Sequence, residues 1–312
     1  MRHPKRVVHC LKRVLVTGAN GFIGRHCLAP LLAAGFDVHA VSRQPRAPQP
    51  GLSWYQVDLL ASDAAHLLLA RIKPTHMLHM AWYATPGLYW TASENFSWVR
   101  ASLDLLEAFT LNGGQRCVVA GTCAEYDWRY GWCSESVTPR APATPYGKCK
   151  DALCSLLAAR AQQSGLSYAW GRIFSLYGPH EYPSRLVSSV ICSLLRRQPA
   201  RCTLGEQVRD FLHVTDVAGA FVTVLNSKLE GTLNIGSGQP LSIKEVVLQI
   251  AMQLNSTDLV RLGAHPSNPH DPPLLVADTT RLSSELRWTP SYNIQCGIAA
   301  TINWWRSELG GG

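Results

Sequence analysis

The sequence feature that most constrains the fold is a glycine-rich turn, Thr17-Gly18-Ala19-Asn20-Gly21-Phe22-Ile23-Gly24. It follows the apolar run Val14-Leu15-Val16 and precedes apolar residues that recur at helical spacing. In a strand-turn-helix unit these glycines allow a tight turn, close approach of backbone to a pyrophosphate, and close packing of helix on strand. The helix N-terminus favours an anion. The sequence therefore predicts a dinucleotide site at Gly18, Asn20, Gly21, Phe22, Ile23 and Gly24.

Short β-rich runs alternate with helical periodicity through the first half of the chain. This alternation predicts an α/β fold, a Rossmann-type doubly wound parallel sheet with a smaller C-terminal α/β substrate lobe. Strands are expected at residues 13–17, 37–42, 53–57, 75–81, 116–121 and 168–174. Helices are expected at about 94–111, 145–164, 184–197 and 243–254. We assign residues 1–174, with 207–235 returning, to the dinucleotide-binding domain, and residues 175–206 and 236–312 to the substrate lobe.

Composition argues against a membrane-spanning, a disulfide-rich or a nucleic-acid-binding protein. With 46% hydrophobic and 16% charged residues among 312, the chain is expected to be globular, and it has no apolar run long enough to cross a bilayer. Residues 1–13 are interpreted as a short leader into the first strand. The ten cysteines lack metal-ligand spacing, so no metal and reduced thiols in the cytoplasm are expected. The net charge of +8 is scattered, which favours an anionic small molecule over nucleic acid.

The end of the second expected strand bears on the choice of dinucleotide. NAD sites typically place an acid there for the ribose hydroxyls, whereas a nearby arginine accommodates a 2′-phosphate. This chain has Ser42 and Arg43, with Arg46 close behind. A guanidinium attracts the phosphate. We therefore expect NADP(H) to be preferred, with NAD(H) possible.

Tyr146 and Lys150 lie four residues apart at the start of an expected helix, so they share one face. A free phenol has a pKa near 10 and is a poor base at neutral pH. A neighbouring ammonium stabilises the phenolate and is expected to lower that pKa. The pair is therefore a candidate for proton transfer.

Together, the Gly-x-x-Gly-x-x-Gly turn, the Tyr-x-x-x-Lys pair and the segment Val118–Tyr126 before it resemble the extended short-chain dehydrogenase/reductase family of nucleotide-sugar epimerases, dehydratases and ketoreductases. The resemblance covers nearly the whole chain. It implies that Thr122 hydrogen-bonds the reacting oxygen, that Lys150 also reaches the nicotinamide ribose, and that Asp58 and Leu59 contact adenine. Met80, Ala81 and Trp82 follow the fourth strand and are expected beside the cofactor; Trp82 lines the pocket or plugs the core.

The resemblance also implies a nucleotide-diphosphate sugar as substrate. Arg209, in Val208-Arg209-Asp210-Phe211, matches the arginine that grips the diphosphate, and a fork of donors suits phosphate oxygens. Ser175 stands where relatives usually carry an Asn near the diphosphate. Cys123 and Ala124 are expected beside the sugar with Thr122. His79, His180 and His213 lack metal-ligand spacing and are interpreted as structural or pocket histidines.

The residues after Thr122 narrow the reaction. Relatives that eliminate water carry an Asp-Glu pair where this chain has Cys123 and Ala124, and relatives that epimerise at C3 or C5 place a Cys where Ala124 stands. Two readings remain: an NADPH-dependent reductase of a nucleotide-linked 4-keto-6-deoxyhexose, and a 4-epimerase that retains NAD. Arg43 favours the reductase. A non-catalytic NADP-binding regulator is the hypothesis from another class.

Relatives often dimerise through four helices, so a homodimer through helices 94–111 and 145–164 is expected.

Overall fold

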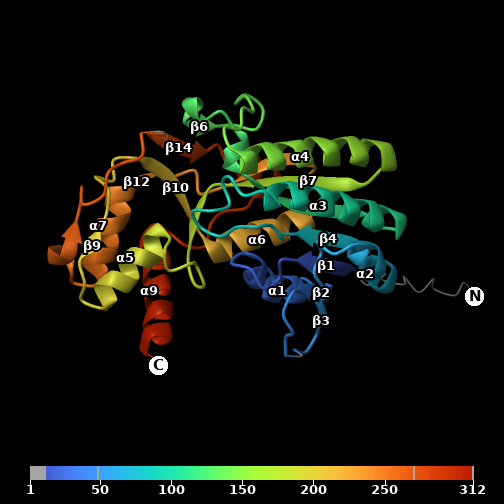
Figure 1. Ribbon diagram of the computed structural model, residues 1–312, viewed down its shortest axis with the longest axis horizontal. Coiled ribbons are helices and arrows are strands. Elements are labelled where there is room, and N and C mark those ends of the chain that lie inside the picture. Colours follow the sequence, from blue (N-terminus) through green and yellow to red (C-terminus); the bar gives the residue numbers. More distant parts are fainter. Residues whose placement is uncertain (1–11, 48, 270, 311–312) are drawn as a thin grey trace, which may run out of the picture.

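A seven-stranded parallel sheet forms the centre of the molecule in the computed structural model, which describes residues 12–47, 49–269 and 271–310 (Figure 1). Most of the expected leader at residues 1–13 therefore lies outside the described residues. The strand order is β3-β2-β1-β4-β5-β7-β11. The bounds are β1 (Arg13–Thr17), β2 (Asp37–Ser42), β3 (Leu52–Gln56), β4 (His76–His79), β5 (Arg116–Thr122), β7 (Ser167–Ile173) and β11 (Gly231–Ile235). The expected doubly wound fold is confirmed.

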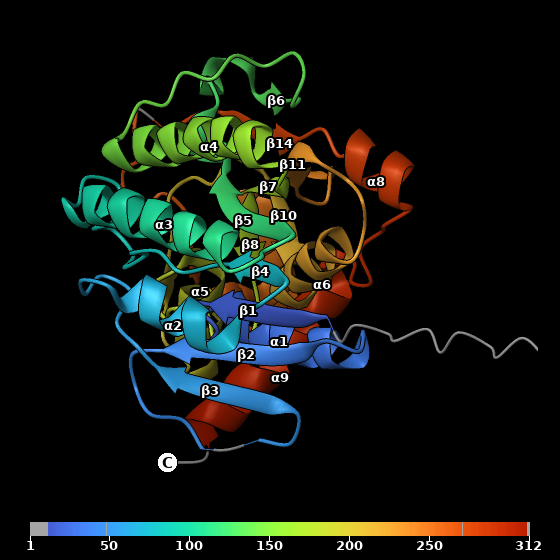
Figure 2. The same cartoon turned by 90° about the vertical axis from the view of Figure 1, so that its right-hand side faces the viewer.

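Helices cover both faces of this sheet because its strands are apolar on both sides. Val14 and Val16 of β1 pack into a core with α1 (Gly24–Ala33) and α6 (Val214–Leu225). Leu15 points the other way, into a core with α2 (Ala64–Ile72), α3 (Glu94–Leu111) and α4 (Pro145–Ser164). Figure 2 shows α2, α3 and α4 side by side across one face. The carboxyl ends of the parallel strands meet at one edge, where such folds bind ligands.

A second group of elements lies at that edge. Its sheet has the order β12-β10-β14-β6, and β8 pairs with β10. The strands are β12 (Pro240–Ser242), β10 (Val208–His213), β14 (Leu274–Ala277), β6 (Trp132–Cys133) and β8 (Ser175–Tyr177). Three helices pack around a separate core: α5 (Leu186–Leu195), α7 (Ile243–Gln253) and α9 (Ile294–Gly310). Two further features belong to this part of the chain. A short ladder pairs β9 (Ala200–Arg201) with β13 (Val260–Arg261), and α8 (Thr280–Leu286) packs against β11.

The observed bounds differ from the expected ones in a few places. The strand expected at 75–81 spans only His76–His79; just after it the backbone N–H groups of Met80 and Ala81 both donate to the Thr17 hydroxyl, at 3.2 Å. Helices α2, α6, α8 and α9 were not predicted. The expected division at residues 174, 207 and 235 stays a proposal, with β11 in the large sheet and β12 in the second. Within the described residues, the helices are all too short or too polar to span a bilayer.

Candidate active site

The glycine-rich turn joins β1 to α1 at the carboxyl edge of the sheet. Gly18 has φ +65°, and a Cβ there would lie 2.7 Å from the backbone nitrogen of Ala81, so both its conformation and its surroundings require glycine. A Cβ on Gly24 would collide with the carbonyl oxygen of Gly18. Because α1 begins at Gly24, its first N–H groups face the turn. The turn thus has the form of an anion site.

The end of β2 presents positive charge to the same edge. Ser42 is buried and its hydroxyl accepts from the backbone N–H of Gln44 at 3.1 Å, whereas Arg43 and Arg46 are exposed. Arg25, on the first turn of α1, donates to the carbonyl oxygen of Asn20 at 2.7 Å. Desolvation and the nearby Arg46 charge lower the Arg25 pKa. The structure therefore brings a positive cluster from the β2 end beside the phosphate-binding turn.

A buried chain of hydrogen bonds fixes the end of β4. The Thr17 hydroxyl accepts two backbone N–H groups and lies 2.6 Å from His79 Nδ1, and His79 Nε2 lies 2.9 Å from the Ser102 hydroxyl of α3. Thr17 must therefore donate to Nδ1, which leaves the proton of the neutral ring on Nε2. Burial, followed by the Lys150 charge, lowers the His79 pKa to about 3. His79 is thus a satisfied structural histidine, and it places Met80 and Ala81.

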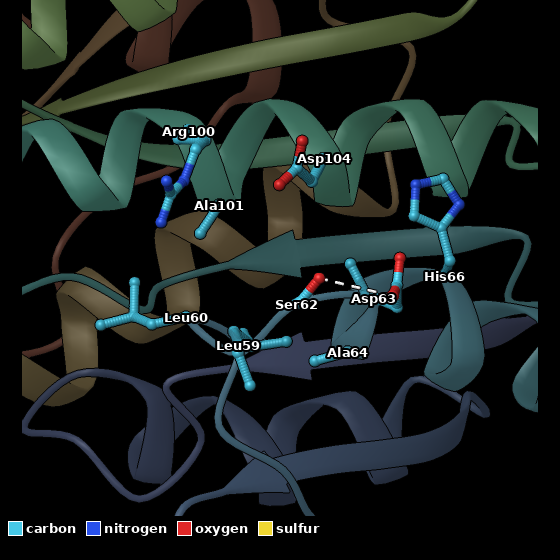
Figure 3. A pocket seen from close by; sticks show the side chains of 11 residues that line it. Leu59, Leu60, Ser62, Asp63, Ala64, His66, Arg100, Ala101 and Asp104 are labelled. Atoms are coloured by element: carbon cyan, nitrogen blue, oxygen red, sulfur yellow. Dashed lines mark hydrogen bonds between the residues drawn. The ribbon is translucent and has the colours of Figure 1, made fainter.

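The loop after β3 carries the expected adenine contacts. The Asp58 carboxylate accepts from the backbone N–H of Leu60 at 3.0 Å, and Leu59 is buried. Leu59 borders a pocket of about 330 Å³ between this loop and α3. Figure 3 shows Arg100 and Asp104 of α3 facing Ser62 and Asp63 across it. This pocket lies beside the loop that is predicted to contact the adenine end of the cofactor.

Thr122 ends β5 and caps a short 3-10 helix, η1 (Cys123–Glu125). Its hydroxyl accepts from the backbone N–H of Ala124 at 3.2 Å, and the Glu125 carboxylate accepts from the backbone N–H of Thr122 at 2.9 Å. Glu125 is fully buried and pairs with Arg172 Nε at 2.7 Å; Trp170 Nε1 donates to the same carboxylate at 2.9 Å. This capping box holds Thr122 at the strand end. Ala124 is buried beneath it, while Cys123 is partly exposed.

Tyr146 lies in the first turn of α4, which Thr144 caps and Pro145 begins. A hydrogen bond from Thr122 lowers the Tyr146 pKa, but burial dominates and the net shift is upward. The lowered value expected from a lysine four residues away is therefore wrong for this arrangement. The reason is burial first and the neighbouring Tyr89 second, while the Lys150 ammonium donates to the carbonyl oxygen of Ala120 at 2.7 Å. Tyr146 keeps its proton at neutral pH.

Lys150 is 4% exposed, and burial lowers its pKa to about 7, opposed by the charge of Glu125. Its ammonium lies 3.8 Å from the centroid of the Trp82 ring. The Trp82 Nε1 donates to the buried Asn95 Oδ1 at 2.8 Å. The partly buried Trp82 ring packs against the core and contacts Lys150, and its expected place beside the cofactor stays a prediction.

Further aromatic rings surround Tyr146. The Tyr89 ring stands edge-on to it at 4.9 Å and the Trp90 ring at 5.7 Å, and Trp90 in turn contacts Trp128. The Arg185 guanidinium lies 5.4 Å from the Tyr89 ring, so the second group of elements reaches the same place. Apolar walls of this kind exclude water from the reacting groups.

Arg209 lies on β10 and is nearly buried. Its Nη2 lies 2.8 Å from Asp271 Oδ1, so the two side chains form an ion pair. The N–H group is not aligned for a hydrogen bond to that oxygen. Its charge and that of Asp210 both act on the Cys123 thiol, whose pKa burial raises to about 12. A cavity of about 470 Å³ opens beside Asp271, with Gln207, Arg201 and His265 in its wall. Ser175 pairs with Phe211 two residues along β10.

The structure thus brings together Thr122, Cys123, Tyr146 and Lys150, with Arg209 on the side of the second sheet. Sequence reasoning missed Glu125, although its position three residues after Thr122 has capping-box spacing. It also missed Asn95, Tyr89 and Arg185, for which no local pattern exists. The described histidines, cysteines and acids form no cluster able to hold a metal ion.

Comparisons with known proteins agree with this arrangement. The NAD dependent epimerase/dehydratase family matches residues 14–236. A dTDP-D-glucose 4,6-dehydratase of Mus musculus is 26% identical over 96% of this chain and 90% of its own. A CDP-abequose synthase of Salmonella typhimurium is 26% identical over 91% and 95%. The solved structure of MoeE5 in complex with UDP-glucose and NAD is 32% identical, covers 95% of this chain and 99% of its own, and superposes with a TM-score of 0.83.

The fold and the family match define the extended short-chain dehydrogenase/reductase class, whose relatives include nucleotide-sugar epimerases and dehydratases. Because the match spans well over half of its length, the chain belongs to the NAD dependent epimerase/dehydratase family. The resemblance expected from its motifs is confirmed.

Proposed function

We propose that the protein reduces the keto group of a nucleotide-linked 4-keto-6-deoxyhexose to a hydroxyl with NADPH. The observation that carries this proposal is which side chains beside Thr122 are able to give or take a proton. The carboxylate of η1, Glu125, is buried and already bound to Arg172 and to the Thr122 N–H. Cys123 and Ala124 replace the acid-base pair that dehydration needs. Tyr146 keeps its proton at neutral pH and can supply it to an oxygen that Thr122 orients.

The chemistry that remains is a simple redox step. When bound at the glycine-rich turn, NADPH would supply the hydride that the carbonyl carbon takes up. Tyr146 gives its proton to the carbonyl oxygen, and Thr122 donates a hydrogen bond to the same oxygen. Lys150, when protonated, favours the phenolate that Tyr146 becomes. Arg209 would release Asp271 and bind the diphosphate, with the nucleotide extending into the cavity beside Gln207.

A preference for NADP(H) is supported by charge at the β2 end. Arg25 and Arg46 lie close enough to repel, Arg43 is exposed beside them, and no acid stands among residues 42–47. Such a cluster binds a 2′-phosphate. Arg46→Asp should weaken NADPH binding about tenfold and leave NADH binding unchanged. Arg71→Asp, on α2, is the control charge reversal.

A 4-epimerase that retains NAD is the second candidate, since the same Thr122, Tyr146 and Lys150 serve it and a UDP-glucose 4-epimerase of Streptomyces lividans is 27% identical. The test is absorbance at 340 nm with NADPH or NADH and a panel of nucleotide 4-keto sugars and hexoses. NADPH consumption with inactive Tyr146→Phe supports the reductase. An isomerised hexose without consumption of NADPH refutes the reductase and supports the epimerase. Binding of NADPH without turnover of any sugar supports a non-catalytic regulator.

We also propose a cytoplasmic homodimer joined through α3 and α4, which lie side by side in Figure 2. Phe96 of α3 is 64% exposed and Leu156 of α4 is 46% exposed, and apolar side chains on adjoining helices favour burial against a partner. Light scattering after gel filtration should give twice the monomer mass, and Phe96→Glu should halve it. A monomeric wild type would contradict this assembly.

A further inference from the structure

Trp82 and Lys150 form a contact that the proposed reaction does not by itself require. The Lys150 ammonium lies 3.8 Å from the centroid of the Trp82 ring and 5.9 Å from that of Trp170. We propose that Trp82 is a positioning residue that holds the Lys150 ammonium over its ring face and keeps it charged. The inference rests on the function proposed above, in which Lys150 acts on Tyr146.

The surroundings of Lys150 explain why its charge needs support. The side chain is 4% exposed, so water solvates it little, and burial disfavours an ammonium. The titratable groups coupled to it are Glu125 of η1 and His79 of β4, and Tyr146 lies about one turn before it on α4. Glu125 already binds Arg172, His79 stays neutral, and Tyr146 keeps its proton. Among the described residues, the carbonyl oxygen of Ala120 and the electron-rich face of Trp82 therefore contact the cation directly, with the Trp170 ring farther away.

The ring of Trp82 is fixed independently of Lys150. Its Nε1 donates to Asn95 Oδ1 at 2.8 Å, and Asn95, which is fully buried, donates from Nδ2 to the carbonyl oxygens of Tyr89 at 2.7 Å and Ala92 at 2.8 Å. The Trp98 ring stacks on Trp82 with centroids 6.2 Å apart. A ring held on both its edge and its side presents a fixed face, so little ordering is needed when the ammonium binds to it.

The contact sets the pH range in which Lys150 is charged. A desolvated ammonium over an indole is stabilised relative to the neutral amine, so loss of the ring should lower the Lys150 pKa by about one unit, a tenfold change in the protonation constant. Phenylalanine keeps a ring face, so Trp82→Phe should retain most of the effect. Trp82→Leu should lose it.

The experiment is a pH titration of the protein labelled with ¹³C at lysine Cε, with the Lys150 signal assigned by its loss in Lys150→Arg. We expect a midpoint near pH 7 in the wild type, a fall of about one unit in Trp82→Leu, and a smaller fall in Trp82→Phe. Trp98→Leu removes the same bulk from the ring that stacks on Trp82 and should leave the midpoint within about 0.3 units. An unshifted Trp82→Leu overturns the proposal, as does an equal shift in Trp98→Leu.

This titration requires neither sugar nor cofactor, so its result is separate from that of the activity assay. If Trp82→Leu shifts the midpoint while NADPH is never consumed, the proposed reaction fails and the contact stands. If NADPH is consumed and the midpoint is unshifted, the reaction stands and the positioning role fails. With both intact, the alkaline limb of kcat/KM should move to lower pH in Trp82→Leu by the same amount as the midpoint.

Discussion

Glu125→Gln is the substitution that most directly tests the buried ion pair of Glu125 with Arg172 beneath the candidate active site. Glutamine keeps the shape of the side chain but removes the charge opposite Arg172. In the structure Glu125 is completely buried and the Arg172 side chain is 2% exposed, so water screens neither charge. The amide would still accept from Trp170 or from the Thr122 N–H, but its NH₂ group would face other donors. The change therefore leaves a buried guanidinium without an anion.

The size of the effect follows from that burial. Removing one partner of a buried ion pair costs about 3–5 kcal/mol. For a chain of 312 residues the entropy of unfolding is about 0.65 kcal/mol per degree, so the melting temperature should fall by about 5–8 °C. Because Glu125 also fixes the Thr122 N–H, kcat should fall as well, even at temperatures where the variant is folded.

Differential scanning calorimetry measures the first effect and single-turnover NADPH oxidation the second. Glu135→Gln is the matched control, because Glu135 is only partly buried and accepts the backbone N–H of Asn234, at 2.7 Å, instead of that of Thr122. The control should lose no more than about half as much stability, in the range of one hydrogen bond to a charged group. A Glu125→Gln variant within about 1 kcal/mol of the wild type would refute the assignment of Glu125 as a buried anchor.

Two further predictions concern acid stability and nucleotide binding. The His79 pKa is about 6.5 in the unfolded chain and about 3 in the folded one. The free energy of unfolding therefore decreases as pH falls through 6.5, by about 2 kcal/mol at pH 5. Urea unfolding at pH 7 and 5 should show a smaller decrease in His79→Gln; an identical decrease would exclude this residue as its source. Asp271→Asn should tighten binding of nucleoside diphosphates two- to fivefold by freeing Arg209, and Arg209→Ala should weaken it, with calorimetry over UDP, CDP and dTDP as the assay. Weaker binding in Asp271→Asn would contradict the competition.

Parts of the site were predictable because their signals are local. The turn at Gly18–Gly24 and the Tyr146–Lys150 spacing are each set within one strand-turn-helix or one helix turn. The Thr122–Glu125 capping box was equally local and was overlooked. The contact of Trp82 with Lys150 joins a loop to a helix 68 positions away, and that of Arg209 with Asp271 joins a strand to a loop, so neither leaves a pattern in the sequence.

The missed helices have a physical explanation as well. Helix α6 is rich in valine and threonine, which favour strands, and it is buried on most sides, so it lacks a polar face. Helix α2 is short and apolar for most of its length. Tertiary packing against α1 and α3 decides both conformations, and a hydrophobic period cannot reveal packing that closes over all faces.

The protonation states of Tyr146 and Lys150 together determine the pH range in which the proposed reduction is fast. An oxidation would begin with a phenolate, whereas burial raises the Tyr146 pKa and leaves a proton ready for donation. Lys150 has a pKa near 7, so it is charged below that pH and neutral above it. Since donation leaves a phenolate that needs the ammonium, reductive kcat/KM should fall as pH rises through about 7, and Tyr146 itself should not limit it there. A reductive rate unchanged to pH 9 would mean that Lys150 keeps its proton through contacts stronger than Ala120, Trp82 and Glu125 provide.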